Sequence, residues 1–165
     1  MGFCSDLKIL YYLACKRTRG ESHAERLESF YGGQADATTW RPECGSVDAI
    51  CFSYSLTMIP DWFAAVDRAY EALKPGGTIG VVDFYIARKY PSEGRAKQSF
   101  STRSFWPVWF SCDNLFLSSD HLPYLSQKFE EALLIERADR MPYCPVFWKK
   151  MPRYVFIGRK PLDAK

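Results

Sequence analysis

The chain has 165 residues, of which 47% are apolar, and its 22 basic and 19 acidic residues give a formal net charge of +3. This length predicts one compact domain with its own hydrophobic core, and so small a charge excess does not by itself argue for a nucleic-acid partner. The 6 cysteines include no CxxC pair, which argues against a zinc site or a disulfide framework, so no metal site is predicted and a reducing compartment is favoured.

The N-terminal part is predicted to be helical. Apolar residues on neighbouring turns predict a helix over residues 6–17. Ser22 and Glu25 match the S-x-x-E capping box and predict the start of a second helix, which the pair Gly32-Gly33 ends. We therefore expect residues 1–36 to form an N-terminal helical segment and residues 37–165 to form the larger part of the fold.

A strand–helix–strand unit is predicted next. Residues 47–54 are rich in β-forming side chains, Asp61 can cap a helix, and the turn Pro75-Gly76-Gly77 ends that helix. Residues 79–86 are almost all apolar, which is typical of a strand covered on both faces, and Asp83 lies near the end of this strand. Units of this kind bind small ligands at the carboxyl ends of their strands.

The C-terminal part predicts a further helix and two strands. Residues 87–119 have no clear period, and so long a connection is usually functional or mobile. Ser119 or Asp120 can cap a helix whose apolar face extends to Leu133. Strands are predicted over residues 133–136 and 153–159, the second at or near the end of the sheet, and an antiparallel hairpin joins them. An α/β sheet that ends in such a hairpin resembles the fold of S-adenosylmethionine-dependent methyltransferases.

Segments over nearly the whole chain resemble the methyltransferase part of betaine lipid synthases. The segments FSYSLTMIPDW (52–62) and WPVWFSCDNLFLSSDHLPYL (106–125) are the most particular to those proteins, whereas LKPGG is common to many methyltransferases. The other similar segments are HAERLESFYGGQAD (23–36), ATTW (37–40), VDAI (47–50), LKPGGTIGVVDFY (73–85) and YVFIGRKP (154–161).

The resemblance implies a Rossmann-like fold and an N-methyltransferase of betaine lipid (diacylglyceryl-trimethylhomoserine) synthesis. Such an enzyme transfers methyl groups from S-adenosylmethionine to the amino group of a diacylglyceryl-homoserine lipid. The expected partners are this cofactor, a lipid or small amine substrate and, by peripheral contact, a membrane surface, with no nucleic acid. No apolar run is long enough to span a bilayer, so the expected location is the cytoplasm or the cytosolic face of a membrane, the endoplasmic reticulum in a eukaryote.

The sequence departs from the family pattern at one important place. The family holds its cofactor with a glycine-rich turn after the first strand, and no GxGxG-type turn is present here. The chain passes from its N-terminal helices to the loop that follows the family's third strand, with the junction near residues 34–37. The expected fold is therefore truncated, with the N-terminal helices and the C-terminal half of the sheet. The sheet would have an open edge at which a partner chain could bind.

The resemblance and the strand ends together suggest residues that bind the cofactor. Asp36, with Ala37 and Thr38, matches the acidic position that hydrogen-bonds the adenine amino group in the family; the alternative is an Asx-turn in a loop. Residues 53–55 leave the end of a central strand, and Met58 follows them. Their alternative roles are strand-end capping and core packing. The complete set of cofactor-binding candidates is Asp36, Ala37, Thr38, Ser53, Tyr54, Ser55 and Met58.

Methyl transfer to an amine needs alignment and a base that takes the ammonium proton. His121 is the candidate base, with Tyr31 as a catalytic partner, and Tyr85, Trp106 and Trp109 are the candidate substrate-binding residues. Aromatic faces can hold a methylated ammonium by cation–π attraction. The alternatives are a solvent-facing helix start for His121 and core packing for the two tryptophans. Basic residues between 88 and 103 either attract anionic lipid or form a solvated surface.

Two other functions are weighed against the methyltransferase. One is a non-catalytic remnant of a methyltransferase that acts as an interaction module through its open sheet edge. The other is a nucleotide-cofactor oxidoreductase, which the missing GxGxxG turn argues against.

Overall fold

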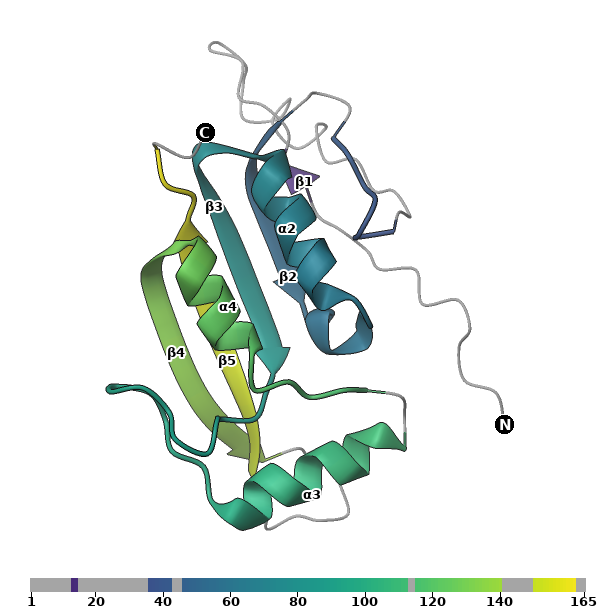
Figure 1. Ribbon diagram of the computed structural model, residues 1–165, viewed down its shortest axis with the longest axis vertical. Coiled ribbons are helices and arrows are strands. Elements are labelled where there is room, and N and C mark those ends of the chain that lie inside the picture. Colours follow the sequence, from purple (N-terminus) through teal and green to yellow (C-terminus); the bar gives the residue numbers. More distant parts are fainter. Residues whose placement is uncertain (1–12, 15–35, 43–45, 113–114, 141–149, 163–165) are drawn as a thin grey trace.

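The computed structural model describes residues 13–14, 36–42, 46–112, 115–140 and 150–162 (Figure 1). In this part the strands form a five-stranded sheet in the order β1-β2-β3-β5-β4. The elements are β1 (Leu13–Ala14), β2 (Val47–Ser53), the short 3-10 helix η1 (Leu56–Met58), α2 (Trp62–Ala72), β3 (Leu73–Phe84), α3 (Phe100–Ser111), α4 (His121–Lys128), β4 (Glu130–Arg140) and β5 (Lys150–Arg159).

The predicted strand–helix–strand unit is present as β2, α2 and β3. The Asp61 side chain accepts a hydrogen bond from the backbone N–H of Ala64 at 3.2 Å, so this N-cap is confirmed. β2 and β3 are parallel, with Ile50 opposite Ile79. The expected Pro-Gly-Gly turn between α2 and the strand is wrong, because β3 begins at Leu73, directly after the helix. Pro75-Gly76-Gly77 instead lies inside β3, where the register with β2 shifts.

Lysine takes over the role of a C-cap for α2. Lys160, just after β5, donates hydrogen bonds from Nζ to the carbonyl oxygens of Tyr70 at 2.7 Å and Leu73 at 2.8 Å. Its ammonium also lies 4.6 Å from the centre of the Tyr70 ring. These contacts satisfy carbonyls that a helix end leaves unpaired, and they tie the end of β5 to the end of α2.

The C-terminal hairpin is confirmed, with β4 and β5 antiparallel and β5 inserted between β3 and the edge strand β4. β4 is much longer than the predicted strand over residues 133–136. Leu133 lies in β4 and not on the helix, because α4 ends at Lys128. The connection that showed no period contains α3, which the sequence did not predict. The Ser99 hydroxyl caps α3 by accepting a hydrogen bond from the N–H of Thr102 at 3.2 Å.

The edge of the sheet beside β2 differs from the prediction. Leu13 and Ala14 form the short strand β1, antiparallel to β2 and opposite Ile50 and Ala49. The helix predicted over residues 6–17 is therefore wrong at these two positions, and the rest of it, with the second N-terminal helix, lies outside the described residues. Part of the edge that we expected to be open is thus paired with the chain's own N-terminal part.

Helices α2 and α4 lie side by side over one face of the sheet, and α3 crosses the end of the sheet at which β2 and β3 finish (Figure 1). Along β3, buried residues alternate with partly exposed ones. The expectation of a strand covered on both faces is therefore wrong for the described residues. The main core lies under α2 and α4, and a second, smaller cluster of Trp106, Phe110 and Met151 joins α3 to β5. No helix in the described residues is long and apolar enough to cross a membrane.

Candidate functional site

The loop after β2 turns sharply at the carboxyl end of the sheet. Tyr54 has a φ of 50°, in the left-handed region that side chains other than glycine rarely adopt. Its backbone N–H donates to the carbonyl oxygen of Val82 at 2.7 Å, so the ladder between β2 and β3 continues to this point. The turn leaves Ser53 and Tyr54 exposed and Ser55 buried. Strained backbone of this kind clusters at functional sites in proteins.

Asp83 fixes that loop from the neighbouring strand. Its carboxylate accepts hydrogen bonds from the Thr57 N–H at 3.1 Å, the Thr57 hydroxyl at 2.9 Å and the Phe84 N–H at 2.7 Å. The side chain is completely buried. Burial raises the pKa of this carboxyl, and the hydrogen bonds from Phe84 and Thr57 oppose that rise. Asp83 therefore positions η1, and its described contacts are structural.

Two further polar side chains are buried at this end of the sheet. His121, the first residue of α4, and Tyr154, which pairs with Asp83 in the ladder of β3 and β5, are both completely buried. Their rings lie 6.2 Å apart, and the His121 ring packs edge-on against Trp62 at 4.5 Å. Neither ring nitrogen of His121 nor the Tyr154 hydroxyl has a hydrogen-bond partner among the described residues, and the same holds for the Ser55 hydroxyl.

Unpaired buried polar atoms are costly, so their presence calls for a missing partner such as water or a ligand. Burial lowers the pKa of His121 to about 4, although the charge of Asp120 opposes the shift. The imidazole is therefore uncharged at neutral pH, and one of its nitrogens can accept a hydrogen bond or a proton. Burial, and secondarily the charge of Asp83, raises the pKa of Tyr154 well above its usual value, so its hydroxyl stays protonated.

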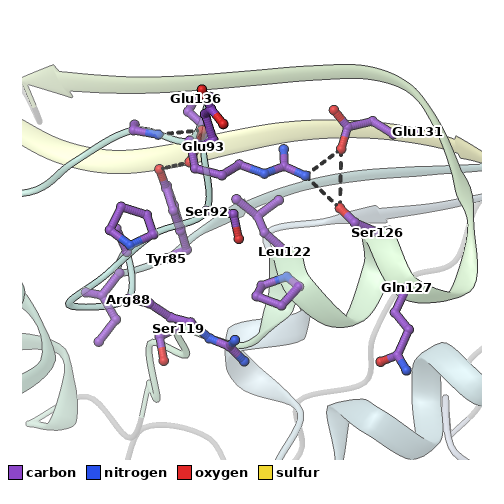
Figure 2. A pocket seen from close by; sticks show the side chains of 17 residues that line it. Tyr85, Arg88, Ser92, Glu93, Ser119, Leu122, Ser126, Gln127, Glu131 and Glu136 are labelled. Carbon is purple, nitrogen blue, oxygen red and sulfur yellow. Dashed lines mark hydrogen bonds and ion pairs between the residues drawn. The ribbon is translucent and has the colours of Figure 1, made fainter.

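A pocket of about 560 Å³ opens between the segment 85–96, α4 and β4 (Figure 2). Tyr85 and Leu122 line it, whereas His121, Tyr154 and Ser55 do not. Glu136 lines the pocket, and its carboxylate accepts hydrogen bonds from the Tyr85 hydroxyl at 2.6 Å and from the Ala96 N–H at 2.9 Å. Arg95 reaches over from the loop to Glu131 at 2.7 Å and to the Ser126 hydroxyl at 2.9 Å. These bonds hold the loop against α4 and β4, and they fix several of the polar groups in a lining that is part polar and part apolar.

The residues predicted to bind the cofactor fall into two groups. Asp36 forms the Asx-turn that was the alternative interpretation, because its carboxylate accepts from the Thr38 N–H at 2.9 Å and hydroxyl at 2.8 Å. These bonds lower the pKa of Asp36. Ala37 is buried in the main core. The second group lies at the end of β2 and consists of Ser53, Tyr54 and Ser55, with Met58 in η1 directly after them. Among the described residues, Asp36 makes no hydrogen bond or ion pair to this second group.

The predicted catalytic and substrate-binding residues do not converge on one place. His121 is buried, so the alternative of a solvent-facing helix start is wrong. Tyr85 lines the pocket, and burial raises its pKa. The prediction for Trp106 is wrong, because it is completely buried in the α3 cluster and donates from Nε1 to the Lys150 carbonyl at 3.0 Å. Trp109 is 37% exposed on α3. Tyr31 lies outside the described residues.

Sequence reasoning missed two residues of this region. Tyr154 was assigned only to a strand, although a tyrosine at a core-facing strand position carries a hydroxyl that needs a partner. For Glu136, the sequence likewise predicts a place in a strand and no role in a site. The available signal for Tyr154 was its place in the β-forming run over residues 154–157, where a buried hydroxyl needs a partner. For Glu136 there was no local signal, because its partners lie in the loop 85–96.

Comparison with known proteins identifies the fold. The sequence matches no protein-family model, and no curated protein resembles it significantly. The structure is similar to that of a SAM-dependent methyltransferase from Methanosarcina mazei, with a TM-score of 0.54, 15% identity, and coverage of 78% of this chain and 66% of that one. It is also similar to the N-methyltransferase NodS from Bradyrhizobium japonicum, in complex with S-adenosyl-L-homocysteine, with a TM-score of 0.53, 11% identity, and coverage of 84% and 59%.

A third similar structure is the cyclase SpnF, with a TM-score of 0.54, 17% identity, and coverage of 79% of this chain and 56% of that one. One fold thus carries more than one reaction, and function has to be argued from the site. The chain spans only 56% to 66% of the length of these three proteins. In its described part the chain has the truncated α/β fold of the S-adenosylmethionine-dependent methyltransferases.

Proposed function

We propose that the protein is an S-adenosylmethionine-dependent N-methyltransferase that acts on the amino group of a lipid headgroup in betaine lipid synthesis. The observation that carries the proposal is the group of buried, unpaired polar atoms of His121, Tyr154 and Ser55 at the carboxyl end of the sheet. In α/β folds this is the end at which ligands bind. The lipid substrate itself rests on the sequence resemblance.

The residues present fit one part of the cofactor. At the strand end the unpaired hydroxyl of Ser55 can exchange hydrogen bonds with an adenosyl group, whereas the exposed carboxylate of Asp36 already accepts from Thr38 and makes no described contact there. Ser53, Tyr54 and Met58 would line the same strand end. No residue in the sequence supplies the glycine-rich turn that lets backbone approach the rest of the cofactor closely. When bound, S-adenosylmethionine supplies an electrophilic methyl group, and we expect this chain to bind it weakly.

His121 is the proposed base. An ammonium group has no lone pair, so it must lose a proton before its nitrogen can attack a methyl group. Burial lowers the pKa of His121 to about 4, so the ring would take that proton only where bound substrate or water solvates the resulting charge. The Tyr154 ring, whose centre lies 6.2 Å from that of His121, is proposed to help orient the imidazole. Tyr85 and the pocket of Figure 2 would receive the acceptor. Glu93 is the lining carboxylate without an ion pair among the described residues, whereas Glu131 is paired with Arg95 and Glu136 accepts from Tyr85 and Ala96.

Calorimetric titration of the full chain with S-adenosylmethionine tests the proposal first. We expect weak but saturable heat that Asp36→Ala and Ser55→Ala reduce severalfold. Absence of heat at millimolar cofactor would contradict catalysis by this chain. Where binding is found, transfer of a labelled methyl group to a homoserine lipid should fall by about 10²-fold or more in His121→Asn. A near-normal rate in that variant would exclude His121 as the base.

A second candidate is a non-catalytic interaction module, which the missing glycine-rich turn favours. In that case the titration with S-adenosylmethionine gives no heat of binding. In the part of the chain that the structure describes, β1 pairs with two residues of β2, and the rest of that strand edge is the place at which a partner strand would add. Blocking that edge with Cys51→Pro should then abolish partner binding, whereas Cys112→Ser on α3 should not.

A further inference from the structure

The outer side of α3 is a surface that the proposed chemistry does not use. Trp106 and Phe110 face inward and are buried, whereas Val108 and Phe100 are 68% and 83% exposed. The side opposite the buried residues contains a shallow groove of about 500 Å³. The groove is lined by Ser101, Ser104, Phe105, Val108, Trp109 and Cys112. We refer to these six residues as the α3 groove, and none of them carries a charge at neutral pH.

The end of the molecule that carries α3 is basic. Arg103 is the only charged residue in the helix. Lys150 is the first residue of β5, and its backbone carbonyl accepts the hydrogen bond from Trp106 Nε1. Arg140, the last residue of β4, lies opposite Lys150 in the strand ladder. Among the described residues, neither Lys150 nor Arg140 forms an ion pair, and Lys97 in the preceding loop is exposed as well. The nearby acidic residue Asp139 is paired with Arg153.

We propose that the α3 groove docks onto an anionic lipid bilayer, with Val108 and Trp109 entering the headgroup region and Lys150 and Arg140 binding acidic headgroups. Helices that lie in a membrane interface combine apolar and aromatic side chains on one side with basic residues at its border. Tryptophan is well suited to that region because its ring is apolar and its N–H is polar. Each basic residue near an anionic surface adds attraction.

A bilayer suits this surface better than a second copy of the chain does. In a two-fold dimer each surface meets its own copy, so a dimer through the α3 groove would bring the basic ends of two molecules together. An anionic lipid surface instead neutralises them. This proposal does not depend on methyl transfer, because it concerns a surface outside the pocket and the strand end.

Flotation with lipid vesicles, without cofactor, tests it on the full chain. We expect binding to vesicles of phosphatidylcholine mixed with phosphatidylserine, and much weaker binding to phosphatidylcholine alone. The double variant Val108→Ser/Trp109→Ser should lower the partition coefficient by about tenfold or more. Lys150→Gln should lower it by about fivefold on the acidic vesicles. Leu162→Ser is the matched control, because Leu162 is 77% exposed next to Gly76, away from α3.

Two results would overturn the proposal. One is binding that the double variant and Leu162→Ser reduce equally, or that does not depend on acidic lipid. The other is a dimer, seen by light scattering, that the double variant dissociates while vesicles bind none of the proteins. Because the altered residues are exposed, all variants are expected to keep the wild-type circular dichroism and melting temperature. Quenching by brominated lipid that disappears in Trp109→Phe gives a second readout of insertion.

Discussion

His121 is a polar side chain in a buried environment that is unfavourable for it. It is completely buried, has no hydrogen-bond partner among the described residues, and packs edge-on against Trp62. An imidazole in such a place stays neutral, because charging it would require a hydration shell that the site does not offer. The lowered pKa keeps the ring uncharged at neutral pH, and it also means that protonating the ring in acid destabilises the folded state.

We predict that acid destabilises the protein through His121. The ring takes up a proton near pH 6.5 in the unfolded chain but only at about pH 4 in the folded one. The free energy of unfolding is therefore unaffected by this group above pH 6.5, and it decreases as the pH falls from 6.5 towards 4. The full loss is about 3 kcal/mol. Urea unfolding at several pH values should show this loss in the wild type and a smaller one in His121→Phe.

The comparison isolates the histidine because the other titrating groups are shared. Asp83, whose pKa is raised, acts with the opposite sign in acid and is present in both proteins. Parallel pH curves for the two proteins would contradict the prediction.

At the scale of elements, α4 and β5 approach each other closely at a glycine. A Cβ added to Gly158 would lie 2.7 Å from Cβ of Phe129, the residue after α4, and 2.7 Å from the Phe156 ring. At Gly80, one strand away in β3, an added Cβ would lie 3.7 Å from Cys51 Sγ, an ordinary contact. A side chain is therefore sterically excluded at Gly158 but not at Gly80, although both glycines lie in the interior of paired strands.

We predict opposite outcomes for the two alanine variants. Gly158→Ala should lower the free energy of unfolding by about 1–3 kcal/mol, because the methyl group must push α4 away from β5. Gly80→Ala should change it by no more than about 0.5 kcal/mol. Chemical denaturation of both variants checks this, and equal effects would show that the close approach of α4 is not what requires Gly158.

The sequence predicted those elements that are specified locally. The cap of α2 at Asp61, the strand β2 and the C-terminal hairpin were all found, because each depends on capping chemistry or on a run of β-forming residues. α3 was not predicted because its buried side is narrow, with Trp106 and Phe110, and because Pro107, a residue that disfavours helix interiors, lies inside it. The contacts of Asp83 with Thr57 and the burial of His121 were not predictable, since both join segments distant in the chain.

On the scale of the whole molecule, stability is unevenly distributed. β3 and β5 each pair on both sides and line the main core, whereas α3 is joined to the sheet through the small cluster of Trp106, Phe110 and Met151. A helix held by so few buried residues opens at lower free energy than a central strand does.

We predict that native-state hydrogen exchange separates these two parts. Amides of β3 around Val81 should exchange only by global unfolding, with a free energy that falls steeply with urea. Amides of α3 should exchange by local opening, with a lower free energy that hardly depends on urea. Identical urea dependence in both elements would mean that α3 unfolds together with the sheet.

The pairing of β1 with β2 has a consequence for the order of events in folding. Ala14 pairs with Ala49, so the contact closes a loop of about 35 residues, and the entropy lost in closure is set against a ladder of two residues in the described part of the chain. Such a contact forms late, once β2 and β3 already offer a rigid template. During synthesis β1 is translated about 35 residues before the part of β2 with which it pairs, so its pairing has to wait for a strand that is made later.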